Sequence, residues 1–344
     1  MENTKTFLFY PILFLVVLLG IDKIFTLPFF ADQFTQNGNI VYYRHRPFLF
    51  ERLKKEPTDK KKLIVAFGDS RAYAYSELAF EGARKESFQV YNFSGPQAVA
   101  AYPVFWLEKM VEQKIDAKLL LLVLSPEGFD DSKGMYNSPL LRMGVDSAFI
   151  QKYLDYIPEK DKEEYYFDRI VSFRKLEFDY KLFIERIKTR SFSEYLIRNN
   201  KHFPILNISK GAQLAYMSFQ NNVKELEKDT LRIKNIYLGK DFKIGNSSFY
   251  FVKRFLEIAK ENRIQAFVVW PRVYPKYKLE YDKLNLDQAY GERLKQVTIE
   301  SGGKYFDLNK DLICDEYYDA SHQSVSCFGK NMNFFVDEYE KLNK

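Results

Sequence analysis

The stretch LIVAFGDSR, at residues 63–71, decides the fold class of this chain. Its first five residues form a continuous apolar run, which is typical of a strand buried on both faces of a sheet. Gly68 then allows a sharp turn where a Cβ would clash. The turn places Ser70 at the start of the next segment, where free backbone N–H groups can stabilise an oxyanion. A lone Gly-Asp-Ser is also a common turn or helix N-cap.

Apolar strands and helical patterns alternate along the rest of the chain. After the strand at 63–67, we expect strands at 88–93, 119–124, 266–270 and 304–308. Helical spacing is found at 76–85, 98–113, 252–262, 291–301 and 330–342. This alternation predicts an α/β fold in which helices cover both faces of a parallel sheet. Ligands of such sheets bind beyond the carboxyl ends of the strands.

Three further parts complete the predicted organisation. Residues 1–31 are the N-terminal segment, and residues 32–62 are a connector that is rich in Arg, Lys and Pro and has no clear period. A long insertion at about 131–246 interrupts the domain at 63–344. It shows helical spacing at 162–190 and 209–233, and we expect a helical cap with solvated faces. The alternative is a lid or groove that binds a polymer or a partner protein.

The N-terminal segment has an uncharged, mostly apolar run at residues 7–21. Asp22 and Lys23 interrupt it, and the apolar pattern resumes at 24–30. A membrane-spanning helix needs about 20 mostly apolar residues, and flanking charges can snorkel to the interface. We therefore expect an uncleaved signal anchor that forms a transmembrane helix. A cleaved signal peptide and a buried core helix are the alternatives. No Cys follows the run, which excludes a lipoprotein anchor.

The composition excludes several classes of protein. With 46% apolar and 28% charged residues among 344, the chain is neither wholly disordered nor a polytopic membrane protein. The net charge of +6 is too weak to indicate a nucleic-acid partner. The 2 Cys exclude a four-thiolate zinc site, and the 3 His argue against a multi-His metal centre. We expect no metal or cofactor, and we expect His45 and His202 on the surface.

A second motif, Asp319-Ala320-Ser321-His322, lies close to the C-terminus. A Ser hydroxyl becomes a useful nucleophile when a neighbouring His takes its proton. That His needs a carboxylate to fix its tautomer and to stabilise the imidazolium. An Asp three residues before the His lets one loop supply both groups. The motif is weak alone, because an incidental surface pair gives the same pattern, but its combination with Ser70 is far more specific.

The two motifs together resemble the SGNH/GDSL family of esterases and acyltransferases. The resemblance covers residues 63–113 and 306–335, and 119–129 matches in part. It implies a flavodoxin-like three-layer sandwich in which Ser70 is the nucleophile, while Asp319 and His322 complete a catalytic triad. It also implies that the backbone N–H of Gly95 is an oxyanion donor, although Gly95 can equally be an ordinary turn glycine.

The resemblance has one clear departure. The family's usual Gly-x-Asn-Asp block is replaced by LSPEGF at residues 124–129, so the usual Asn oxyanion donor is absent. Asn92 and Gln97 are the nearest side-chain amides that can replace it. The Ser-Pro-Glu-x-Phe pattern is more similar to the membrane-anchored branch, which includes the D-alanyl transfer protein of lipoteichoic acid synthesis and the alginate O-acetylation proteins. The chain also resembles spirochaete envelope proteins with this core.

Further polar residues follow the predicted strand ends and are candidates for the lining of the site: Asp69, Arg71, Glu127 and Arg272. Glu127 is either a solvated loop carboxylate or the partner that orders Arg71 or Arg272.

Two cysteines flank the Asp-x-x-His motif. Cys314 and Cys327 bracket it with 12 residues between them. In an oxidising compartment a disulfide between them would close the loop, and the alternative is two buried free thiols.

These features predict an extracytoplasmic, serine-dependent O-acyltransferase that forms an acyl-Ser70 intermediate. The resemblance implies a bacterial inner-membrane protein whose catalytic domain faces the periplasm. It also implies an envelope glycan or lipid acceptor and a multi-pass membrane acyltransferase as partner. A carboxylester hydrolase and a non-catalytic scaffold on a degenerate fold are the alternatives.

Overall fold

One sheet of five parallel strands lies at the centre of the computed structural model, which describes residues 2–27, 39–56, 60–176, 178, 180–190, 203–213 and 218–344. The strand order is β2-β1-β3-β4-β5, and every neighbouring pair is parallel. The strands are β1 (Lys62–Gly68), β2 (Phe88–Asn92), β3 (Ala117–Val123), β4 (Gln265–Trp270) and β5 (Lys304–Asp307). Each overlaps a strand that the sequence predicts, so the parallel α/β fold is confirmed.

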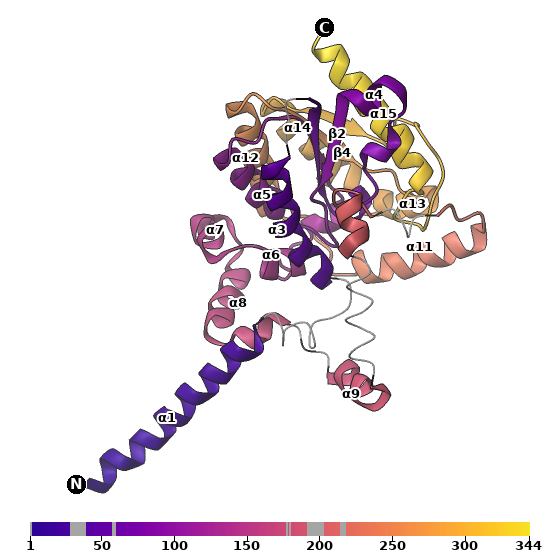
Figure 1. Cartoon of the computed structure of the whole chain (residues 1–344). Helices are drawn as coiled ribbons and strands as arrows, with labels where there is room; N and C mark the ends of the chain where they lie inside the picture. The colour runs from indigo at the N-terminus through magenta and orange to yellow at the C-terminus, as the bar shows by residue number, and fades with distance from the viewer. Residues whose placement is uncertain are drawn as a thin grey trace.

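Helices cover both faces of this sheet (Figure 1). Outside the insertion the helices are α1 (Glu2–Phe25), α3 (Asn39–Lys55), α4 (Gly82–Ser87), α5 (Ala101–Glu112), α12 (Ser247–Glu261), α13 (Pro275–Lys283), α14 (Arg293–Glu300) and α15 (Val325–Leu342). Val65 and Phe67 of β1 belong to an apolar cluster with α5 and α12, whereas Ile64 and Ala66 belong to a second cluster with α15. Successive strand side chains point to opposite faces, so a continuous apolar run buries both.

The predicted helix at 76–85 is wrong in its continuity. A 3₁₀ turn, η2 (Glu77–Ala79), is followed by the separate short helix α4. Gly82 begins that helix with a φ of +52°, a left-handed conformation that a continuous right-handed helix does not contain. The pattern of apolar residues therefore reports burial here rather than one regular helix.

The insertion predicted at 131–246 begins and ends on neighbouring backbone. The Asp131 N–H donates to the Lys243 carbonyl at 2.9 Å, and the Gly245 N–H donates to the Phe129 carbonyl at 2.8 Å. Within it lie α6 (Pro139–Gly144), α7 (Ser147–Lys152), α8 (Glu159–Ile170), the 3₁₀ turn η5 (Ser172–Leu176), α9 (Tyr180–Thr189) and α11 (Val223–Tyr237). The helical content is confirmed, but shorter helices replace the two long ones that the spacing predicts.

The segment expected to be an irregular connector contains the 17-residue helix α3. Leu49 and Leu53 of this helix are buried in the main apolar cluster. The expectation of a surface His45 is wrong, because His45 is fully buried and packs against the ring of Phe203. Burial lowers the pKa of His45 to about 3, and the adjacent charge of Arg46 acts in the same direction. His202 lies outside the described residues.

Helix α1 extends away from the sheet domain (Figure 1). In the described part of the chain, no helix has both the length and the apolar character needed to cross a membrane. The two charges that interrupt its apolar run make specific contacts. Asp22 accepts the N–H groups of Ser172 and Phe173 at 2.7 and 2.8 Å. Lys23 donates to the last carbonyls of α8, so the pair joins α1 to the insertion.

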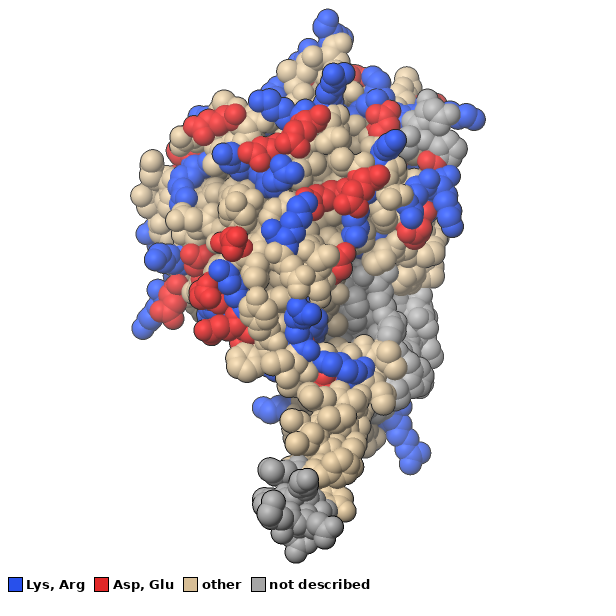
Figure 2. Space-filling model, turned by 90° about the vertical axis from the view of Figure 1, so that its left-hand side faces the viewer, with Lys and Arg blue, Asp and Glu red and all other residues tan. Residues whose placement is uncertain are grey.

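Charges of both signs are interspersed on the face shown in Figure 2. Many charged side chains among the described residues are in short-range ion pairs, such as Arg254 with Glu257 at 3.5 Å and Lys109 with Asp146 at 3.1 Å. Such exposed pairs contribute little to stability individually, so the fold rests mainly on the two apolar clusters.

Candidate active site

Ser70 lies directly beyond the carboxyl end of β1, in the 3₁₀ turn η1 (Ser70–Ala72). Gly68 is required for this turn: its φ is +136°, and a Cβ there would lie 2.1 Å from the Val123 carbonyl oxygen. The Asp69 side chain then accepts the Arg71 N–H at 2.8 Å and caps the turn. The second Asp69 oxygen accepts the Ser125 hydroxyl, which ties the turn to the end of β3.

Ser70, His322 and Asp319 form one hydrogen-bonded chain. Ser70 Oγ lies 2.7 Å from His322 Nε2, and His322 Nδ1 lies 2.9 Å from both carboxylate oxygens of Asp319. With Asp319 accepting from Nδ1–H, Nε2 is left to accept the Ser70 hydroxyl proton. The side chains of His322 and Asp319 are 18% and 14% exposed, so these three hydrogen-bonded groups are largely shielded from solvent but still accessible to a small molecule.

The loop that carries Asp319 folds around that carboxylate. Asp319 Oδ1 accepts the backbone N–H groups of Ser321 at 2.7 Å and His322 at 2.9 Å. Burial would raise the pKa of Asp319, but the charge of His322 and these hydrogen bonds hold it down, at about 2. Asp319 is therefore ionised at neutral pH, as a carboxylate that stabilises an imidazolium must be.

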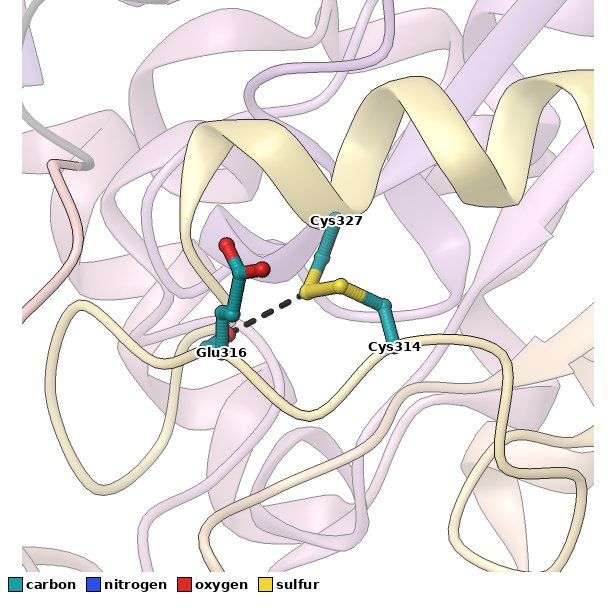
Figure 3. Close-up of side chains that lie close together, drawn as sticks. All are labelled: Cys314, Glu316 and Cys327. Atoms are coloured by element: carbon teal, nitrogen blue, oxygen red, sulfur yellow. Dashed lines mark hydrogen bonds between the residues drawn. A yellow bond between two sulfur atoms is a disulfide. The ribbon is translucent and has the colours of Figure 1, made fainter.

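The predicted crosslink between Cys314 and Cys327 is present, with a Cα–Cα distance of 5.3 Å (Figure 3). It joins the loop before the Asp-x-x-His motif to the first turn of α15. Glu316 lies close to both sulfur atoms, and these three residues are the described group whose atoms are close enough to hold a metal ion. Because each sulfur is bonded to the other, neither is a free thiolate ligand.

Arg71 and Glu127, which line the same cavity as Ser70 and His322, form a buried, bidentate ion pair. Both Arg71–Glu127 contacts are 2.7 Å, and the two side chains are 7% and 9% exposed. Tyr277 and Tyr281 each donate a hydroxyl to Glu127 Oε1 at 2.7 Å. Arg71 Nε also donates to the Ser321 carbonyl at 2.9 Å, so this pair holds the His loop against the Ser loop.

The same ion pair controls the charge of Glu127. Burial opposes ionisation, but the charge of Arg71 and its hydrogen bonds lower the pKa of Glu127 to about 2. Glu127 thus orders Arg71, one of the two roles expected for it, and is not a solvated loop carboxylate. Arg272 is not part of this network: it pairs with Asp315 at 3.0 Å and donates to Tyr317. The prediction that Arg272 lines the site is wrong.

Two predicted oxyanion donors are engaged elsewhere. The Gly95 N–H donates to the Gly68 carbonyl at 3.0 Å, and a Cβ on Gly95 would lie 2.1 Å from Leu140 Cδ1. Gly95 is thus needed because a side chain at this position would overlap Leu140. The fully buried Asn92 donates its amide to the carbonyls of Ala72 and Tyr75 at 2.7 and 3.0 Å, which fixes the segment after Ser70. Neither group is positioned here as the missing donor.

Gln97 remains a candidate donor. It is exposed and lines the same cavity as Ser70 and His322, although its amide makes a long contact of 3.4 Å with the Tyr237 hydroxyl. Its backbone has a φ of +52° and is held by the Ser138 hydroxyl, which donates to the Gln97 carbonyl. Among the described residues, no acceptor contacts the backbone N–H of Ser70, so that group can also face an oxyanion.

A cavity of about 250 Å³ opens beside Ser70 and His322. Its walls come from the strand-end loops and from the insertion. Besides the predicted Asp69, Arg71, Gln97 and Glu127, the lining includes residues that the sequence did not single out: Ala98, Val99, Phe129, Asp130, Asp131, Lys133, Met135, Asn137 and Tyr237. The lining combines apolar and polar side chains, as small-molecule sites commonly do.

The tyrosines that support Glu127 were also missed. Tyr277 and Tyr281 are four residues apart on α13, a spacing that places both hydroxyls on one helix face. The spacing indicates that the two tyrosines share a helix face, but it does not indicate that the Glu127 carboxylate lies opposite that face.

The family model described as "Protein of unknown function (DUF1574)" matches residues 3–339, nearly the whole chain. No curated protein shows a significant match.

Proposed function

We propose that this chain, which belongs to the DUF1574 family, is a serine-dependent O-acyltransferase that acts on a cell-envelope glycan or lipid. The observation that carries the proposal is the continuous chain from Ser70 Oγ through His322 to Asp319, beside a cavity large enough for an acyl group. A nucleophile, its base and the group that orients the base are the minimum set for covalent acyl transfer.

The reaction that we propose has two steps. His322 Nε2 removes the Ser70 proton while Ser70 Oγ bonds to the acyl carbon of an ester or thioester. The Ser70 N–H stabilises the resulting oxyanion, and the leaving oxygen or sulfur takes the proton from His322. In the second step His322 deprotonates an acceptor hydroxyl, which attacks the acyl-Ser70 ester. The ester bond breaks, and Ser70 recovers its proton from His322.

The finer fold assignment belongs to the same proposal. The strand order β2-β1-β3-β4-β5 supports a flavodoxin-like, SGNH-type sandwich, since this is the order of that doubly wound class. We propose that α1 anchors the chain in the bacterial inner membrane. Leu15, Val16 and Val17 on α1 are each at least 50% exposed, and a bilayer would cover such side chains. A multi-pass membrane acyltransferase would then supply the acyl donor on the outer side.

The first experiment is labelling with a fluorophosphonate probe, which reacts with activated serines. The wild type should be labelled and S70A should not. S87A is the matched control, because Ser87 is exposed and its hydroxyl bonds only within α4. Equal labelling of the wild type and S70A rejects the serine mechanism.

The second experiment separates transfer from hydrolysis. Envelope glycans and lipids from cells that express the wild type or S70A are compared for ester-linked acyl groups. Loss of those groups in S70A supports transfer. Unchanged acylation, together with release of free acid from short esters by the wild type, identifies a carboxylester hydrolase instead.

A further inference from the structure

The cavity beside Ser70 has an excess of negative charge. Of the residues that the structure describes, four carboxylates line it, Asp69, Glu127, Asp130 and Asp131, together with two cations, Arg71 and Lys133. Two negative charges therefore remain uncompensated within the lining. A sphere of about 250 Å³ is about 8 Å across, so a charge inside the cavity lies within a Debye length of every wall.

Both lining cations are already engaged. Arg71 is held by Glu127 in the bidentate pair. Lys133 donates to the carbonyls of Ile236 and Tyr237 at 2.9 and 3.4 Å, where α11 ends, and its Nζ lies 3.8 Å from Asp130. Neither cation is therefore arranged to receive an anionic substrate, which would compete with protein acceptors for it.

Asp131 is the lining carboxylate that is still available. It is exposed, and in the described part of the chain its side chain makes no hydrogen bond and no ion pair within 4.0 Å, although the charge of Lys243 attracts it from farther away. Its position is nevertheless fixed: its N–H donates to the Lys243 carbonyl, and its carboxylate packs on Gly245, where a Cβ would lie 1.7 Å from Oδ1. Partial desolvation raises the pKa of Asp131; the charge of Lys243 opposes this shift, and the charge of Asp130 reinforces it.

We propose that Asp131 makes this cleft select against anionic substrates and prefer groups that are uncharged or cationic. This inference rests on the proposed function and narrows its substrate class. An ordered, unpartnered carboxylate attracts cations and hydrogen-bond donors and repels anions, and the low dielectric of a cleft strengthens both effects. A polyanionic acceptor is therefore disfavoured next to Ser70, while a neutral polyol or a zwitterionic headgroup, with its ammonium toward Asp131, is favoured.

The test uses three 4-nitrophenyl esters of similar length whose acyl tails differ in charge. They are the butyrate, the hemisuccinate and the 4-trimethylammoniobutyrate, which are neutral, anionic and cationic. For the wild type we expect kcat/KM for the anionic ester to be at least about tenfold below that for the cationic one. In D131N this ratio should shrink about tenfold, and 0.5 M salt should weaken it in the wild type.

Two control variants make the result specific. D131E keeps the charge and should retain the wild-type ratio. D116N removes a 62% exposed carboxylate just before the amino end of β3, whereas Ser70 lies beyond the carboxyl end of β1, and it should also retain the ratio. An anionic ester that is used as well as the cationic one, or a D131N ratio equal to that of the wild type, overturns the inference.

Failure of the proposed function is measured separately. If the wild type and S70A hydrolyse all three esters equally, the serine mechanism fails, whatever the charge preference. Ligand-observed NMR then measures the binding of methyl butyrate and of methyl hemisuccinate to S70A, which gives the charge preference without turnover. Tighter binding of the hemisuccinate also overturns the inference.

Discussion

Ser70 Oγ and His322 Nε2 lie 2.7 Å apart although 252 positions separate them in the chain. Ser70 is placed by the end of β1, and His322 by the loop that precedes α15. The Arg71 side chain spans the same two loops, because it pairs with Glu127 and donates to the Ser321 carbonyl. The alignment of the triad therefore depends on a buried network as well as on its own hydrogen bonds.

Replacement of Asp319 by Asn should lower kcat by about 10³- to 10⁴-fold without unfolding the protein. The amide cannot stabilise the imidazolium, and it favours the wrong tautomer of His322. The measurement is ester turnover, with folding checked by circular dichroism. D315N is the control, since Asp315 pairs with Arg272 rather than His322. A D319N variant that keeps more than about a tenth of the activity would contradict the triad.

Replacement of Glu127 by Gln should cost about 3–5 kcal/mol of stability, because it leaves the buried Arg71 charge uncompensated. E127D and R71K test geometry, since both keep the charge but lose the bidentate fit. Denaturant unfolding measures the free energy. A loss below about 1 kcal/mol for E127Q would show that the pair is not a structural requirement.

The same network should make the protein sensitive to acid. The folded-state pKa values of Glu127 and Asp319 are both about 2, below their usual values of 4.5 and 3.8. Because folding lowers both pKa values, the two ionised carboxylates stabilise the folded state. Their contribution to the free energy of unfolding is complete above about pH 5 and is lost as the pH falls towards 2. E127Q should therefore show a flatter loss of stability between pH 5 and 2. If the stability of E127Q falls as steeply with pH as that of the wild type, Glu127 is not a source of the acid sensitivity.

Removal of the disulfide should lower stability by about 3 kcal/mol, the chain-entropy value for two residues 13 positions apart. The C314S/C327S variant should also lose activity, because the crosslink closes the loop that presents Asp319 and His322. Non-reducing peptide mapping should find the 314–327 crosslink in native protein. Two alkylatable thiols in that material would show that the bridge does not form.

Replacement of Gly95 by Ala should destabilise the protein by about 1–3 kcal/mol, because the added methyl overlaps the buried Leu140. A second substitution, L140A, should relieve that overlap, so the G95A/L140A double-mutant cycle should show a favourable coupling. A cycle with no coupling would mean that Gly95 is needed for a reason other than shape.

The sequence predicts this fold and much of the site because both rest on local patterns. Short apolar-rich runs bounded by turn residues predict all five strands. Each of the two site motifs is a short turn organised by its own Asp: Asp69 caps the turn of Ser70, and Asp319 accepts the N–H groups of Ser321 and His322. Such hydrogen bonds join residues two or three apart, so residue type and spacing are enough to indicate them.

Other properties were decided only by the tertiary structure. Whether the Gly95 N–H is free depends on the Gly68 carbonyl opposite it. Whether Glu127 pairs with Arg71 or with Arg272 depends on how three loops meet. The burial of His45 depends on where α3 packs, although no period marks that helix. Hydrogen-bond partners, burial and local charge are set by groups distant in the chain, and no local spacing encodes them.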